Sequence, residues 1–258
     1  MSIAAPERTL LAGVAGDIET LIELPDSDLH SQPRAIAVCC HPHPLFGGAM
    51  TNKVIHTVAR SFVASGAIAL RFNFRGVGAS AGVHDAGRGE LDDLIRVVEW
   101  ARARWPFLPL WLGGFSFGAW MVLRAHAVLA PQLLVTVAPP VGRWNFDDVQ
   151  KPHCPWLVVQ GSKDELVDAQ AVRRYAQTLD PSVDYVEIEG ADHFFHGRLH
   201  ELKDESFDVL TMWHVLEHVP NLNETLVQFN QLLSKKGKII SRLISINTTV
   251  RSFKMSWG

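Results

Sequence analysis

A serine framed by glycines, in the sequence Gly-Phe-Ser-Phe-Gly at residues 114–118, restricts the possible folds of this chain more than any other feature. The apolar run at 110–115 has the length of a buried strand, and residues 119–129 are rich in helix formers. A G-x-S-x-G sequence between a strand and a helix is typical of a sharp turn that exposes the serine hydroxyl. Glycines suit both flanking positions because a Cβ there would clash with the strand or helix. We therefore predict that Ser116 is a nucleophile at a strand end.

Apolar runs and amphipathic segments alternate on both sides of this turn. This alternation predicts an α/β fold with a mostly parallel sheet that is covered by helices on both faces. The first 30 residues are poorly patterned and suggest an edge hairpin. Ligands of such sheets bind at the carboxyl ends of the strands. The expected strands are 34–40, 67–74, 110–115, 133–138, 156–160 and 183–188, and the expected helices are 51–65, 90–105, 119–129 and 169–179.

The composition is that of a globular protein and excludes several classes of function. The 258 residues are 47% hydrophobic and 20% charged, and the net charge is −3, so we expect no nucleic-acid or membrane partner. No apolar run approaches the roughly 18 residues that a membrane span needs, and residues 1–8 do not resemble a secretion signal. Cys39, Cys40 and Cys154 are expected to be free thiols, with the first two facing opposite sides of a strand. We expect a cytoplasmic protein.

Two later strand ends carry the partners that a nucleophilic serine needs. A base must remove the serine proton, and a carboxylate must orient that base. Asp164 follows the 156–160 strand, and His193 follows the 183–188 strand. The order serine, acid, histidine is the one that accompanies a G-x-S-x-G turn. We expect Ser116, Asp164 and His193 to meet at one edge of the sheet as nucleophile, acid and base.

Four other titratable residues in these two loops compete for the same roles. Asp168 lies where the 169–179 helix needs an N-cap, and Glu165 is expected to face away. Asp192 is expected to bond to the loop backbone, and His196 lies near the start of a further helix. We expect none of the four to be catalytic.

An oxyanion hole needs backbone N–H donors near the nucleophile. One is the N–H of the residue after the serine, Phe117, and the other comes from the loop after an earlier strand, here residues 41–48. Two prolines in that loop lack an N–H, which leaves His43 or Leu45. We favour His43 and leave Leu45 open.

These motifs together resemble those of the α/β-hydrolase superfamily, and in particular the small bacterial dienelactone-hydrolase-like esterases. The resemblance covers residues 1 to about 203. It implies an α/β-hydrolase fold, a triad of Ser116, Asp164 and His193, and a carboxylic ester substrate. Dienelactone hydrolases themselves use a cysteine nucleophile, where this chain has serine. The motifs are His-Pro-His-Pro-Leu-Phe-Gly-Gly at 41–48, Arg-Phe-Asn-Phe-Arg-Gly-Val-Gly-Ala-Ser at 71–80, and the segments 114–118, 161–167 and 192–195.

The spacing of the later strands leaves no room for a large cap domain. Only 17 residues separate Ala138 from Trp156. We therefore expect an open site that prefers short acyl chains.

The C-terminal stretch resembles a different family. Phe-Asp-Val at 207–209, Val-Leu-Glu-His-Val at 215–219 and Lys-x-Gly-x-Ile-Ile at 235–240 are similar to the later half of class I methyltransferases that use S-adenosylmethionine. The glycine-rich loop with which such enzymes hold the cofactor is missing, so we expect no methyl transfer. We predict a catalytic domain at 1–203 and a non-functional fragment or fused appendage at 204–258, whose origin stays open.

Metal binding is a further alternative at two places. His41 and His43 could be ligands, but no Asp, Glu or Cys with suitable spacing lies nearby. The sequence His-Val-Leu-Glu-His at 214–218 matches a zinc-protease signature, and the methyltransferase resemblance accounts for the same residues. We expect neither a metal nor a cofactor.

Taken together, the sequence predicts a serine esterase that works through an acyl-enzyme on a small-molecule ester. A thioesterase or peptidase on the same triad, and a catalytically inactive binding protein, are the alternatives. The oligomeric state, including a homodimer, stays open.

Overall fold

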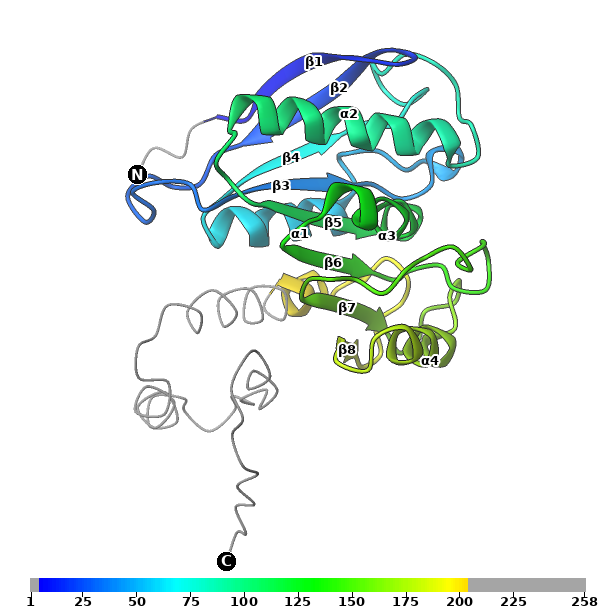
Figure 1. Ribbon diagram of the computed structural model, residues 1–258. Helices are drawn as coiled ribbons and strands as arrows, with labels where there is room; N and C mark the ends of the chain where they lie inside the picture. The colour runs from blue at the N-terminus through cyan, green and yellow to red at the C-terminus, as the bar shows by residue number, and fades with distance from the viewer. Residues whose placement is uncertain (1–4, 204–258) are drawn as a thin grey trace, which may run out of the picture. The chain divides into compact units, whose positions relative to one another are not determined.

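Eight strands form one sheet in the order β1-β2-β4-β3-β5-β6-β7-β8 in the computed structural model, which describes residues 5–203 (Figure 1). All neighbours from β4 to β8 are parallel, and β2 is antiparallel to both β1 and β4. The predicted α/β-hydrolase fold is therefore confirmed, including the hairpin at the sheet edge. The strands are β1 (Glu7–Gly13), β2 (Gly16–Glu23), β3 (Ala35–Cys40), β4 (Ala67–Phe72), β5 (Leu110–Phe115), β6 (Leu133–Val137), β7 (Trp156–Gly161) and β8 (Asp184–Ile188).

Four α-helices connect the parallel strands, and their bounds lie close to those expected. No bound differs by more than two residues; at the start of α3, helical geometry begins directly after Ser116 rather than at residue 119. Asp168 caps the last of these helices, as predicted, because its side chain accepts the N–H of Gln170. The helices are α1 (Lys53–Ala64), α2 (Arg88–Arg104), α3 (Phe117–Leu129) and α4 (Ala169–Leu179), and a short 3-10 helix, η1, spans Pro44–Phe46.

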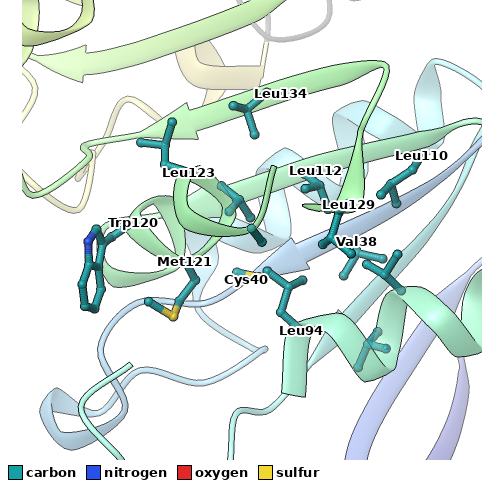
Figure 2. Close-up of a cluster of buried hydrophobic side chains, with 14 of the residues drawn as sticks. Val38, Cys40, Leu94, Leu110, Leu112, Trp120, Met121, Leu123, Leu129 and Leu134 are labelled. Carbon is teal, nitrogen blue, oxygen red and sulfur yellow. The ribbon is translucent and has the colours of Figure 1, made fainter. Parts of the chain in front are cut away.

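The helices cover both faces of the sheet, as the sequence predicts. On one face, β3 and β5 pack against α2 and α3 through a buried apolar cluster that includes Cys40, Leu112 and Met121 (Figure 2). On the other face, α1 lies so close to β5 that a Cβ on Gly113 would fall 2.8 Å from the ring of Phe62. Removal of this apolar surface from water is the main stabilising term, at roughly 25 cal/mol per Å² buried.

The register of the sheet brings the relevant loops together. Cys40 at the end of β3 pairs with Gly114, so the loop after β3 starts beside the serine turn. Gly161 at the end of β7 pairs with Ile188 at the end of β8, so the loops of Asp164 and His193 also start side by side. The loops that follow these strands thus lie together at the carboxyl ends of the parallel strands.

The predictions for residues 204–258, the methyltransferase-like fragment and the His-Val-Leu-Glu-His sequence, lie outside the described residues. Within residues 5–203, no helix combines the length and the apolar character needed to cross a membrane.

Candidate active site

Ser116 lies on a strained turn between β5 and α3. Its φ of 53° and ψ of −116° are unfavourable for a residue with a side chain, and such strain is often found at functional sites. The flanking glycines permit the turn, since a Cβ on Gly114 would lie 2.3 Å from the Gly118 carbonyl oxygen. A Cβ on Gly118 would lie 2.1 Å from the carbonyl oxygen of Cys40. The turn therefore matches the geometry predicted for a nucleophile.

His193 lies between Ser116 and Asp164 and reaches both. Its Nε2 is 3.1 Å from Ser116 Oγ, and its Nδ1 is 2.8 Å from Asp164 Oδ2. The imidazole is 3% exposed and the carboxylate is fully buried, so water does not compete for the contact between them. The structure thus brings together the three residues that the sequence selects.

The carboxylate of Asp164 is fixed by the loop that carries it. Oδ1 accepts the N–H groups of Leu166 and Val167, and Oδ2 accepts the side-chain amide of Gln160 as well as the imidazole. Hydrogen bonds to the charged form satisfy a buried carboxylate that would otherwise be costly to desolvate. The carboxylate of Asp164 is therefore held in a fixed direction, aimed at His193.

Hydrogen bonds also join the Asp164 loop to the His193 loop. The N–H of Lys163 donates to the carbonyl of Ala191, and the N–H of Gly190 donates to the hydroxyl of Ser162. A Cβ on Gly161 would lie 2.4 Å from the Ala191 oxygen, so this close approach requires glycine. The acid and the base are thus carried by two loops that are held as a unit.

Of the competing residues, three contact groups outside the proposed triad. Asp168 caps α4, Asp192 accepts the N–H of His196, and the His196 ring lies against Asp192 rather than Ser116. The expectation that Glu165 faces away is wrong: its Oε2 accepts the backbone N–H of His193 at 3.2 Å. Side-chain direction in an irregular loop depends on the segment lying across it, which the sequence does not specify.

The loop after β3 brings His43 and Leu45 into different hydrogen-bonding situations. The N–H of Leu45 donates to Nδ1 of His43 at 3.1 Å. A Cβ on Gly48 would lie 2.1 Å from the Pro42 carbonyl, so the loop closes tightly on itself. With the Leu45 N–H engaged, His43 is the better placed of the two alternatives as a backbone donor.

His41 has a structural role that the sequence analysis missed. The N–H of Phe74 donates to Nε2 of His41 at 3.0 Å, so Nδ1 carries the proton and donates to the carbonyl of Pro42. Burial lowers the pKa of His41 to about 4, which keeps the ring neutral near pH 7. The ring therefore connects the loop after β3 to the loop after β4. In the sequence, only the neighbouring prolines indicate that this loop has a fixed conformation.

Aromatic rings gather around His43 beside the serine turn. The ring centroids of Phe46, His84, Phe117 and Trp144 lie 4.7, 4.9, 5.0 and 5.4 Å from that of His43. His84 Nδ1 lies 2.7 Å from an oxygen of Glu90, which is fully buried. Phe117, the residue after Ser116, is thus part of a ring cluster centred on His43.

The fold and these contacts define a serine hydrolase of the α/β class, and comparison with known proteins agrees. A sequence model of the family described as serine aminopeptidase, S33, matches residues 31–151. A protein from Xanthomonas campestris, XC6422, described as an α/β serine hydrolase without lid, is 44% identical, with a TM-score of 0.78 over 81% of this chain and 95% of that one. The chain belongs to the α/β serine hydrolase family.

Two further relatives support this assignment. An α/β serine hydrolase homologue from Coxiella burnetii is 38% identical, with a TM-score of 0.76 over 81% of this chain and all of that one. The uncharacterized protein RP471 of Rickettsia prowazekii is 34% identical over an alignment of 201 residues that covers 73% of this chain and 84% of that protein.

A second sequence model, described as a methyltransferase domain, matches residues 142–257, in line with the resemblance noted above. The described part of that range, up to residue 203, contains two strands of the hydrolase sheet, β7 and β8, and the helix α4 between them. Asp164 and His193 lie in this part, so the hydrolase site includes residues on both sides of the start of the methyltransferase match.

Proposed function

We propose that this protein hydrolyses carboxylic esters with short acyl chains through a covalent acyl-enzyme. Ser116 Oγ attacks the ester carbonyl while His193 Nε2 takes its proton. His193 then gives that proton to the leaving alcohol, and the ester C–O bond breaks. A water molecule, deprotonated by His193, hydrolyses the acyl-serine and restores the free hydroxyl.

Asp164 and two backbone groups support this chemistry. The carboxylate of Asp164 keeps Nδ1 protonated and so leaves Nε2 free to act as the base. The N–H groups of Phe117 and His43 stabilise the oxyanion of each tetrahedral intermediate. The single observation that carries the proposal is the chain of contacts from Ser116 Oγ through His193 to Asp164, at 3.1 and 2.8 Å.

The short segment between β6 and β7 supports the preference for short acyl chains. Residues 138–155 contain no helix, and a single isolated bridge joins Val141 to Trp144. Without a cap domain, little apolar wall is available to bury a long chain. The rate should therefore fall from p-nitrophenyl acetate and butyrate to the octanoate and longer esters.

Labelling with a fluorophosphonate tests the activated serine directly. We expect the wild-type protein to be labelled, and Ser116→Ala to be unlabelled and about 10⁶-fold slower in turnover. Asp192→Asn serves as a matched control, since this carboxylate contacts His196 rather than the proposed triad. An unlabelled wild-type protein would favour the alternative of an inactive binding protein.

The name of the matching family model makes peptide hydrolysis a second candidate. An aminopeptidase has to bind the substrate's α-ammonium group, and a free carboxylate near the serine would do this. Among residues 5–203, three carboxylates contact His193 or the ring cluster around His43, and each already has a partner. These are Asp164 with the His193 imidazole, Glu165 with the His193 N–H, and Glu90 with His84. We therefore favour esters, and an assay with alanine p-nitroanilide beside alanine methyl ester separates the two activities.

A further inference from the structure

The imidazole of His43 stabilises the turn at residues 43–46. The backbone N–H of His43, the proposed oxyanion donor, belongs to the same turn. Its Nδ1 accepts the N–H of Leu45 at 3.1 Å and so caps η1, which begins at Pro44. The His43 carbonyl accepts the N–H groups of Phe46 and Gly48. Side chain and carbonyl together close the turn around the backbone of His43.

The same ring contacts the other half of the proposed oxyanion hole. Phe117, whose N–H is the first donor, has its ring 5.0 Å from that of His43. Trp144 and Phe46 pack on the imidazole as well, at 5.4 and 4.7 Å between centroids. A side chain packed on this many rings has few rotamers available, so its hydrogen bond to Leu45 is kept in place.

We propose that the His43 imidazole is a positioning residue for the oxyanion hole, in which the unprotonated Nδ1 keeps the turn at 43–46 in the conformation that presents the His43 N–H. The inference rests on the proposed function. A protonated Nδ1 is a donor and cannot accept the Leu45 N–H. The oxyanion hole therefore depends on a neutral His43, in addition to the neutral His193 that the chemistry itself requires.

The surroundings of His43 favour its neutral form. Burial, followed by the charge of His84, lowers the pKa of His43, and buried Glu90 acts in the opposite direction. His41, the other imidazole in this loop, is neutral above about pH 4. At neutral pH, Nδ1 of His43 is thus free to accept, and the capping bond is lost only in acid.

Two substitutions of His43 separate the capping bond from the packing of the ring. His43→Phe keeps an aromatic ring but has no acceptor, whereas His43→Asn supplies a side-chain oxygen that caps well and does not titrate. With p-nitrophenyl acetate, we expect His43→Phe to lower kcat between about 10- and 100-fold, with KM nearly unchanged. We expect His43→Asn to recover most of that loss.

A matched control removes a different cap from the same loop region. Asn52 caps α1 by accepting the N–H groups of Val54 and Ile55, nine residues after His43. Asn52→Ala should lower the melting temperature without lowering kcat. If it lowers kcat as much as His43→Phe does, loss of stability alone accounts for the effect and the inference is wrong.

The pH profile gives a readout that a purely structural role would not change. In the wild-type protein, protonation of His193 stops the reaction, and protonation of His43 removes the capping bond and lowers kcat/KM further, so the acid limb should be steeper than that of one proton where both rings are protonated. In His43→Asn only His193 remains, and the limb should fall to a slope of one. Identical limbs, a His43→Phe variant with wild-type kcat, or a His43→Asn variant as slow as His43→Phe would each overturn the inference.

Fluorophosphonate labelling keeps this outcome distinct from failure of the proposed function. If the wild-type protein is not labelled at Ser116, the proposed function itself is wrong. If Ser116 is labelled and the His43 variants behave like the wild type, only the role of the imidazole is wrong.

Discussion

The loops after β7 and β8 place an acid and a base beside Ser116, and the loop after β3 places a backbone donor there. On the acid–base side, the key groups are side chains, and buried hydrogen bonds fix them: Asp164 accepts hydrogen bonds from Gln160, Leu166, Val167 and His193. On the oxyanion side, the key groups belong to the backbone, and neutral imidazoles at His41 and His43 hold the turn. One side therefore depends on residue identity and the other on loop geometry.

Substitutions on the acid–base side should have the largest effects. His193→Ala should lower kcat by about 10⁶-fold, because it removes the base that contacts Ser116 Oγ. Asp164→Asn should lower it by about 10⁴-fold, because the amide favours the wrong tautomer of His193. Hydrolysis of p-nitrophenyl acetate measures both variants, and near-wild-type activity in either one would contradict the proposed relay.

A change of loop geometry should have a smaller but clear effect on the oxyanion side. Gly48→Ala would place a Cβ 2.1 Å from the Pro42 carbonyl and displace the segment that carries His43. Loss of one oxyanion donor lowers kcat by about 10²–10³-fold. The low-field proton signal of His193 Nδ1–H should persist, because the contact with Asp164 is not touched.

Gly47→Ala is the matched control for this experiment. A Cβ on Gly47 meets nothing within 4 Å, although its φ of +78° disfavours alanine. This variant should lose stability and keep most of its kcat. Equal losses of kcat at residues 47 and 48 would show that strain in the loop, and not displacement of His43, is responsible.

The sequence predicts the acid–base side better than the oxyanion side for the same physical reason. Ser116, Asp164 and His193 each follow a recognisable strand, and parallel strands bring their ends together whatever the detailed loop structure. The choice between His43 and Leu45 depends instead on a hydrogen bond within an irregular loop. No periodic pattern of residues reports such a bond.

Glu165 shows the same limit on the acid–base side. It lies next to Asp164 and was expected to face away. The His193 loop crosses over it, and the backbone N–H of His193 meets its carboxylate. The fold class and the three side chains that meet at the strand ends follow from the sequence, whereas the strand order and the contacts between two irregular loops require the three-dimensional arrangement.

The oxyanion side should also be sensitive to acid in the folding equilibrium. An unfolded histidine binds a proton near pH 6.5, whereas buried His41 binds one only near pH 4. Between these values the unfolded chain holds more protons, so the free energy of unfolding rises with pH. Stability from His41 is present above pH 6.5 and falls by up to about 3 kcal/mol as the pH drops to 4.

Urea unfolding between pH 4 and pH 7 measures this effect in the wild-type protein and in His41→Gln. The glutamine can accept the N–H of Phe74 without titrating. Its free energy of unfolding should therefore change less over this range than that of the wild type. If the two proteins lose equal stability in acid, His41 is not the group responsible.

The smallest effect should come from Asp168, which differs from Asp164 in role although the two lie in one loop. Asp168 accepts the N–H of Gln170 at the start of α4, and its side chain is 65% exposed, whereas that of Asp164 is fully buried against His193. Asp168→Ala should cost about 1 kcal/mol of stability, because a helix loses its cap, and should leave kcat unchanged. Thermal unfolding and p-nitrophenyl acetate hydrolysis test both parts. A large fall in kcat would mean that α4 helps to hold the Asp164 loop in place, and the acid–base side would then depend on loop geometry as the oxyanion side does.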